Sequence, residues 1–370
     1  MAPVAREATP APAPPREPPT HLELVLDNGT SIRFGMLWQG QYEALGNSQN
    51  DDYSKNLFLR RFALQLAGKV LHRFEYFFDT DFADLLKASG PDSVKNGPNI
   101  ATKDALVTFR VVEDALKIEG GLLLPPGARN SLVGGAVLFN LDFFRNTFRH
   151  GAAFNTADNS FARDLGVQAR GVVADGRLEY RLGAFQGRRS VPVSGPPSRA
   201  GARNSFRVAG RLQLNLLDPE LGYLYAATYL GKKRILSFGL SADYQHEADD
   251  SYVAYAADGV LDLPAGPGIL TGEVDVVHRD GGDLLELPEQ TALSGELGYH
   301  INVLELSPIV RYEHRWMDAA PGDETALGAG LGYWPFGHTS NLKLLYQRII
   351  PEGPALAYNQ FNLQGQLFFF

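Results

Sequence analysis

Hydrophobic and polar residues alternate along most of the chain from about Ser31 onward. In the first segment of this kind Phe34 and Trp38 share one face, and Arg33 and Gln39 lie on the other. A period of two is typical of a β-strand with one apolar face and one polar face. A helix would place the charged residues of these segments on all sides.

The alternation recurs in sixteen segments. We predict strands near 32–43, 57–66, 70–79, 105–112, 116–124, 165–173, 178–186, 206–216, 236–245, 252–263, 270–278, 291–301, 308–316, 325–333, 342–348 and 359–370. An even number of strands with short turns at one end and longer loops at the other is typical of a transmembrane barrel. The pattern therefore predicts an all-β fold, a transmembrane antiparallel β-barrel of about 16 strands.

Hydropathy agrees with this interpretation. The mean hydropathy is -0.16, and no run approaches the roughly 18 apolar residues that a membrane-spanning helix needs. The 22 Phe, 15 Tyr and 3 Trp suit the aromatic girdles of a barrel, and the last segment alternates up to a terminal Phe370. A soluble sandwich is the alternative, but its two sheets would have to hide sixteen apolar faces in one core.

The composition excludes some classes of function, and it separates an N-terminal segment from the rest of the chain. A net charge of -8 argues against nucleic acid as a partner, and the absence of Cys excludes disulfides, thiolate catalysis and cysteine-bound metal. Residues 1–28 are rich in Pro and Ala, and we expect a disordered or extended segment there, whereas 29–370 form the barrel. The first twenty residues contain no apolar core of an export signal.

Several stretches resemble the phosphate-selective porin O and P family of Gram-negative outer membranes. These are 104–149, with ALVTFRVV, LKIEGGLLL and PPGARNS; 163–187, with GRLEYR; the pair Arg60 and Arg61; VRYEHRW; and the ending NQFNLQGQLFFF. The resemblance implies a sixteen-stranded homotrimeric porin in the bacterial outer membrane, in contact with lipid and lipopolysaccharide. It also implies that the third long loop, here 125–161, folds into the lumen and narrows it.

The same loop is the longest early break in the strand pattern. The apolar spacing from Leu138 to Phe148 predicts a short helix against the inner wall. An extracellular loop with a surface helix is the alternative. For the constriction itself we single out Arg129, Asp142, Arg145 and Arg149.

The charged faces predict a lumen with two different walls. Residues 161–211 contain ten Arg and three acids, whereas 240–300 contain thirteen acids and one Arg. The pore-lining candidates are Arg33, Arg61, Arg73, Arg110, Arg170, Arg181, Arg207, Arg211, Asp258, Glu273, Asp275, Glu296, Arg311 and Glu313. Opposed walls would set up a transverse field. The alternative is a solvated lumen without selectivity.

We expect weak selectivity. Strong phosphate selectivity needs many donors at one depth, and Lys232 and Lys233 fall in an expected outer loop. The family's named substrate is therefore not carried over.

Enzymatic chemistry finds little support. Ser241 lies in GLSAD, which is not a nucleophile elbow, and the eight histidines are scattered. The glycines of 328–332 alternate on one strand face and make room for a loop. The acidic cluster at 246–250 is expected to be solvated, so we predict no metal and no cofactor.

The sequence favours a porin that passes small polar solutes or inorganic ions. The alternative is a non-conducting barrel that serves as a structural or partner-binding component.

Overall fold

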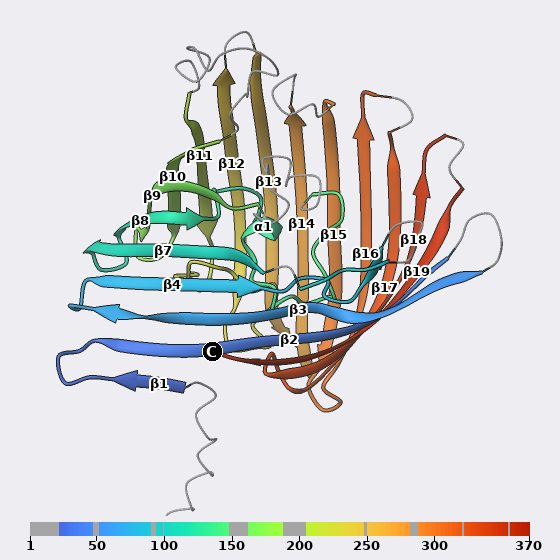
Figure 1. The fold of residues 1–370 in the computed structure, drawn as a ribbon, viewed down its shortest axis with the longest axis horizontal. Helices are drawn as coiled ribbons and strands as arrows, with labels where there is room; N and C mark the ends of the chain where they lie inside the picture. Colours follow the sequence, from blue (N-terminus) through green and yellow to red (C-terminus); the bar gives the residue numbers. More distant parts are fainter. Residues whose placement is uncertain are drawn as a thin grey trace, which may run out of the picture.

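A computed structural model describes residues 22–46, 52–89, 94–98, 100–147, 162–187, 205–247, 250–281, 288–319, 322–353 and 356–370. Sixteen of its strands form one closed antiparallel barrel (Figure 1). They are β2 (Ser31–Gly46), β3 (Tyr53–Val70), β4 (Phe74–Asp81), β7 (Ala101–Val112), β8 (Leu116–Leu123), β9 (Asp164–Val173), β10 (Leu178–Phe185), β11 (Arg207–Asn215), β12 (Ile235–Glu247), β13 (Asp250–Ala265), β14 (Gly268–Asp280), β15 (Gln290–Ile301), β16 (Leu306–Met317), β17 (Glu324–Phe336), β18 (Ser340–Pro351) and β19 (Tyr358–Phe369). The predicted fold class is confirmed.

The barrel closes where β19 pairs with β2. In this register Gln364 lies opposite Gln41, and Gln366 lies opposite Gln39. Both pairs face inward and are joined by side-chain hydrogen bonds, of 3.0 Å from Gln364 to Gln41 and 2.7 Å from Gln39 to Gln366. Closure leaves no strand edge exposed along this seam, so no other chain can pair with the sheet there.

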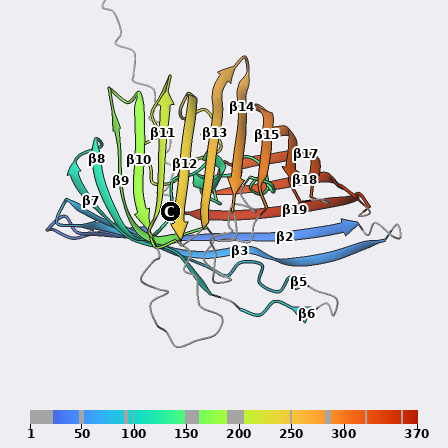
Figure 2. The same ribbon diagram turned by 90° about the horizontal axis from the view of Figure 1, so that it is seen from above.

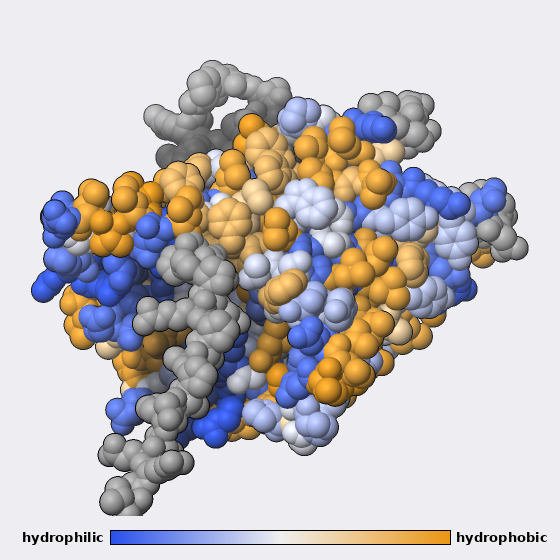
Figure 3. Space-filling view, turned by 90° about the horizontal axis from the view of Figure 1, so that it is seen from below, coloured by the Kyte–Doolittle hydropathy of each residue, from blue (hydrophilic) through white to orange (hydrophobic). Residues whose placement is uncertain are grey.

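The period of two sorts side chains between the lumen and the outer surface. On β11 and β12 Leu212 and Leu240 are 55% and 65% exposed, whereas Arg211 and Gln213 are buried. Apolar side chains cover much of the outer face that is seen in Figure 3. The predicted alternation is therefore confirmed on these strands: the polar face points inward and the apolar face outward, as lipid contact requires.

Three smaller elements accompany the barrel. Strand β1 (Leu22–Val25) pairs with the start of β2, beyond the point where β19 ends. β5 (Ala88–Ser89) and β6 (Val94–Lys95) form a separate two-stranded sheet apart from the barrel wall (Figure 2). α1 (Arg129–Leu132) is a single helical turn. The described part of the chain has no helix that is long and apolar enough to cross a membrane.

The two ends of the barrel differ in their connections. At the end that holds the C-terminus, six connections are short turns, at 71–73, 113–115, 174–177, 266–267, 302–305 and 337–339. The exception at this end is residues 216–234 between β11 and β12, which we call the T segment. The loop between β8 and β9 starts from the opposite end, and we call its described part, 125–147, the L segment.

Candidate pore and constriction

The L segment lies inside the barrel, held by carboxylates of the wall. The backbone N–H groups of Arg129 and Asn130 donate to Asp258 and Asp275, each at 3.1 Å. The N–H of Asn146 donates to Glu313 at 2.9 Å. Backbone donors at the start of a helical turn have no partner within the helix, so acidic side chains satisfy them well.

The predicted inward path of 125–161 is thus seen for its described residues. Its second half does not form the helix expected over 138–148. Residues 138–147 form bends and a turn, and the side chains of Asn140 and Asp142 accept from the N–H of the following residue, at 2.8 and 3.0 Å. These local bonds compete with helix formation. Phe148, Arg149 and the rest of the loop lie outside the described residues.

The T segment enters the lumen from the short-turn end and meets the L segment there. Val133 and Tyr225 form a parallel bridge. The N–H of Tyr225 donates to Leu132 O at 2.9 Å, and the N–H of Gly134 donates to Tyr225 O at 3.0 Å. Two loops from opposite ends of the barrel are therefore joined by backbone hydrogen bonds. The connection that holds Lys232 and Lys233, which we expected to be an outer loop, lies at the short-turn end of the barrel.

A buried ion pair strengthens this junction. The Arg129 guanidinium donates to both carboxylate oxygens of Glu220, at 2.6 and 2.8 Å, and lies over the Tyr225 ring at 4.8 Å. Arg129 is 0% and Glu220 1% exposed. Burial alone would raise the pKa of Glu220, but the charge and hydrogen bonds of Arg129 outweigh it and hold the pKa below its usual value.

Wall arginines hold the T segment by its carbonyls. Arg170 donates to Leu221 O at 3.2 Å, and Arg181 donates to Tyr223 O at 2.9 Å. The two walls of the lumen therefore bind different backbone groups. Arginines of β9 and β10 bind carbonyls of the T segment, whereas carboxylates of β13, β14 and β16 bind N–H groups of the L segment. Each wall carries the charge that complements the backbone groups it meets.

A β-bulge brings two consecutive arginines to the L segment. Gln39 pairs with Arg61 and Gly40 pairs with Leu59, so Arg60 is the extra residue of β3. Arg60 donates to Asp142 at 2.9 Å and Arg61 donates at 2.6 Å. Burial opposes ionisation of Asp142, but the two guanidiniums overcome it and keep the pKa of Asp142 well below its usual value.

Apolar packing fills the lumen next to β16 and β17. Leu132, Phe139 and Tyr225 from the two segments pack with Ile309 and Trp334 of the wall. Gly330 allows close approach, since a Cβ there would lie 3.2 Å from Asn140 Oδ1. Of the glycines of 328–332 that were predicted to make room for a loop, Gly330 does so, whereas Gly328 and Gly332 lie against side chains of the wall.

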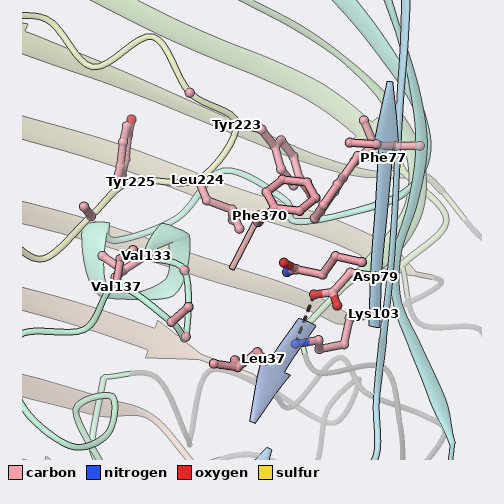
Figure 4. Close-up of a pocket in the computed structure, with 18 of the residues that line it drawn as sticks. Leu37, Phe77, Asp79, Lys103, Val133, Val137, Tyr223, Leu224, Tyr225 and Phe370 are labelled. Carbon is pink, nitrogen blue, oxygen red and sulfur yellow. Dashed lines mark ion pairs between the residues drawn. The ribbon is translucent and has the colours of Figure 1, made fainter. Parts of the chain in front are cut away.

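A cavity of about 750 Å³ stays open on the other side of the lumen, between the two segments and β2, β3, β4 and β7. Figure 4 shows part of it, with Phe77, Tyr223 and Phe370 near the ion pair of Asp79 and Lys103. The basic residues that line it are Arg33, Arg60, Arg61, Lys69, Lys103, Lys117, Arg163, Arg170 and Lys233, and the acidic ones are Glu23, Glu75, Asp79 and Asp81.

Sixteen of the eighteen predicted site residues fall into three groups. Arg33, Arg61 and Arg170 line the open cavity. Buried residues that bind the segments or pair along the wall are Arg129, Arg181, Arg207, Arg211, Asp258, Glu273, Asp275, Glu296, Arg311 and Glu313. The others are Arg110, which pairs with Glu75, and Asp142 and Arg145 of the L segment, which pair with the arginines of β3 and with Glu324.

Arg73 does not lie on the wall. It is exposed in the turn 71–73, where positive φ angles at Leu71 and His72 reverse the chain. Sequence reasoning also missed Lys103, Arg163 and the whole T segment as parts of the site. A connection of this length at the short-turn end is the one signal that could have revealed the T segment.

Comparison with known proteins identifies the fold. No family model matches this sequence, and no curated protein matches it. Solved structures do match over nearly the whole chain. OmpF of Salmonella typhi, solved with daunomycin, has a TM-score of 0.62 at 11% identity and covers 94% of this chain and 100% of its own. DcaP, an outer-membrane channel of Acinetobacter baumannii, has a TM-score of 0.59 at 12% identity, with 94% and 99% covered.

An anion-selective porin of Comamonas acidovorans is similar to the same degree. It has a TM-score of 0.58 at 12% identity, and the match covers 92% of this chain and 100% of that one. The barrel of this chain therefore has the fold of the outer-membrane porins.

Proposed function

We propose that the chain is a porin of the bacterial outer membrane, through which small hydrophilic solutes or inorganic ions diffuse passively. The observation that carries the proposal is the cavity of about 750 Å³ beside the in-folded L segment, inside a barrel whose strands turn many large apolar side chains outward. A polar passage within an apolar cylinder suits diffusion of water-soluble molecules across lipid. The short-turn end would face the periplasm, as is usual for such barrels.

Weak selectivity for simple ions is part of the proposal. The basic groups at the passage have acidic neighbours: Arg163 lies 2.9 Å from Asp104, Arg170 lies 2.5 Å from Glu119, and Lys103 is shared by Asp79 and Asp81 at 3.1 and 3.4 Å. Paired charges cancel much of each other's field at the distance of a passing ion. Neither cations nor anions then gain a large advantage.

The proposal also includes the oligomeric state and the family of the chain. A homotrimer surrounded by lipid and lipopolysaccharide is expected from the porin fold and from the sequence resemblance to the phosphate-selective porin O and P family. We do not extend phosphate selectivity to this chain, because the lumenal arginines are engaged with carboxylates and backbone carbonyls.

A second candidate is a non-conducting barrel that serves as a structural or partner-binding component of an outer-membrane complex. The observation that favours it is the meeting of the L and T segments, whose apolar side chains pack against β16 and β17 inside the lumen. The two candidates differ in whether the open cavity connects the two barrel ends.

Single-channel recording in a planar bilayer tests the proposal. A homotrimeric porin is expected to give stepwise openings in groups of three, with a reversal potential near zero in a KCl gradient. Folded protein that inserts without conductance would favour the structural alternative. A strong anion preference would contradict weak selectivity. Gel migration with and without boiling checks that the barrel is folded.

A further inference from the structure

The open cavity carries an apolar surface that a simple diffusion pore does not need. Inward side chains of large barrels are usually polar. Here the rings of Phe77 and Tyr223 lie 6.2 Å apart, and those of Phe77 and Phe370 lie 5.9 Å apart. Leu224 and Val137 extend the same surface (Figure 4). Strand β4, the two segments and the C-terminus thus build one apolar wall inside the lumen.

This wall is fixed before any solute arrives. The Tyr223 hydroxyl donates to Asp104 at 2.8 Å and accepts from the N–H of Leu124 at 2.7 Å. The Arg33 guanidinium lies 5.5 Å from the centre of the Phe370 ring. With its hydroxyl occupied, Tyr223 offers a solute its ring and not its polar atom. A preformed surface costs little entropy when a ligand binds.

The charges around the wall favour anions with an apolar part. Nine basic and four acidic side chains line the cavity. The carboxylates that pair with Arg163 and Arg170 are Asp104 and Glu119, which are both 0% exposed and do not line it. Arg163 and Arg170 are themselves only 10% and 9% exposed. Arg33 and Lys69, at 39% and 50%, are more open to a solute, and their ion pairs with Glu23 and Glu75 are long, at 3.9 Å each. A small inorganic anion does not bury apolar surface against the rings, and a neutral aromatic molecule lacks the negative charge that the basic side chains attract.

We propose that this cavity binds organic anions that combine an aromatic ring with a carboxylate, the ring against Phe77 and Tyr223 and the carboxylate toward the basic side chains. Such pockets typically have volumes of roughly 300 to 1,000 Å³, mostly apolar walls and a few polar groups. The inference rests on the proposed porin function, which it deepens: simple ions pass with weak preference, and aromatic carboxylates are retained in transit.

Calorimetric titration of the folded, detergent-solubilised full chain tests the binding without requiring conductance. The probes are phenylacetate, acetate and phenethylammonium, which separate the ring from the charge. Phenylacetate is expected to bind at least about tenfold more tightly than either of the others. Raising KCl from about 0.15 M to about 1 M should weaken it several-fold, because the screening length falls from about 8 Å to about 3 Å.

Two neighbouring phenylalanines of β4 provide a matched pair of variants. Phe77→Ala removes the cavity ring and should weaken phenylacetate binding about fivefold. Phe78→Ala removes a ring that is 39% exposed on the outer face, and binding should not change. Gel migration verifies that both variants fold.

Equal affinity for phenylacetate and phenethylammonium, or equal loss in the two variants, would overturn the inference. Bilayer recording on the same preparation keeps the two proposals apart. A conducting barrel that does not discriminate refutes the binding site alone, whereas a barrel that binds phenylacetate without conducting refutes diffusion alone.

Discussion

Arg129 and Glu220 form a buried bidentate ion pair, at 2.6 and 2.8 Å, between two segments that enter the barrel from opposite ends. The pair is 91 residues apart in sequence. Because neither side chain is exposed, each charge depends on the other for stabilisation. This contact makes the L and T segments one inner structure, and it suggests how that structure can be loosened without disturbing the barrel.

Glu220→Gln should loosen the junction strongly. It removes the bidentate partner of the buried Arg129 charge and leaves Glu273, 4.0 Å from Arg129 Nε, as a more distant carboxylate; breaking comparable buried pairs costs about 3–5 kcal/mol. Hydrogen exchange at the backbone amides of 129–134 and 220–229 should accelerate by roughly two orders of magnitude or more. Lys232→Ala removes an exposed charge from the same segment and should leave exchange unchanged. The double variant Arg129→Met with Glu220→Met should recover much of the protection; equal exchange in all variants would show that the pair does not hold the junction.

Shortening the T segment should widen the passage. With 217–233 replaced by an Asn-Gly turn, the lumen loses Tyr223 and Leu224 from one side of the cavity. Conductance should rise by roughly a factor of two, since it follows the open cross-section of a water-filled pore. Replacing the exposed turn 302–305 in the same way is the control and should change nothing. An unchanged conductance after the first replacement would place the narrowest point elsewhere.

Sequence alone predicts the barrel well because alternation is a local property. The segment around Leu212 and Gln213 needs no distant partner to reveal which side chains face lipid. The closure of β19 on β2 follows once the strands are counted. The same reasoning assigns the polar faces to the lumen, and the structure agrees on β11 and β12.

The inner structure depends on contacts that local patterns do not encode. The T segment has no period, and its partner Arg129 lies far away in the chain. The apolar spacing after Leu138 resembles a helix face, but Phe139 and Phe144 are buried against different neighbours, and Asn140 and Asp142 bond their own backbone. In the predicted strand 57–66 Arg60 and Arg61 are adjacent charges that a strict alternation would place on opposite faces. Arg60 is the bulged residue of β3, which explains the departure.

Asp142 should set the ionic preference of the passage. Asp142→Asn leaves Arg60 and Arg61 without their shared carboxylate, so the ratio of chloride to potassium permeability should rise roughly threefold at neutral pH. Reversal potentials in a KCl gradient measure this ratio. Asp318→Asn, an exposed change outside the lumen, is the control and should have no effect.

The pH dependence of the wild type follows from the lowered pKa of Asp142. A carboxylate with a depressed folded-state pKa contributes stability above its unfolded value, about 3.9, and loses it as the pH falls through the lower folded value. Conductance and selectivity should therefore be constant from neutral pH down to about pH 4. A change between pH 7 and pH 5 would show that another group controls the passage.

The outer face of β12 should be sensitive to charge in a way that a soluble protein's surface is not. Leu240 is 65% exposed near the middle of the strand, and Val303 is 83% exposed in a turn. If Leu240 contacts lipid, Leu240→Arg should destabilise the folded barrel in bilayers by about 2–4 kcal/mol, because an arginine at the membrane midplane loses its hydration. Val303→Arg should have little effect, since the turn lies in water. Reversible unfolding from lipid vesicles measures both, and equal stability of the two variants would contradict a lipid-facing β12.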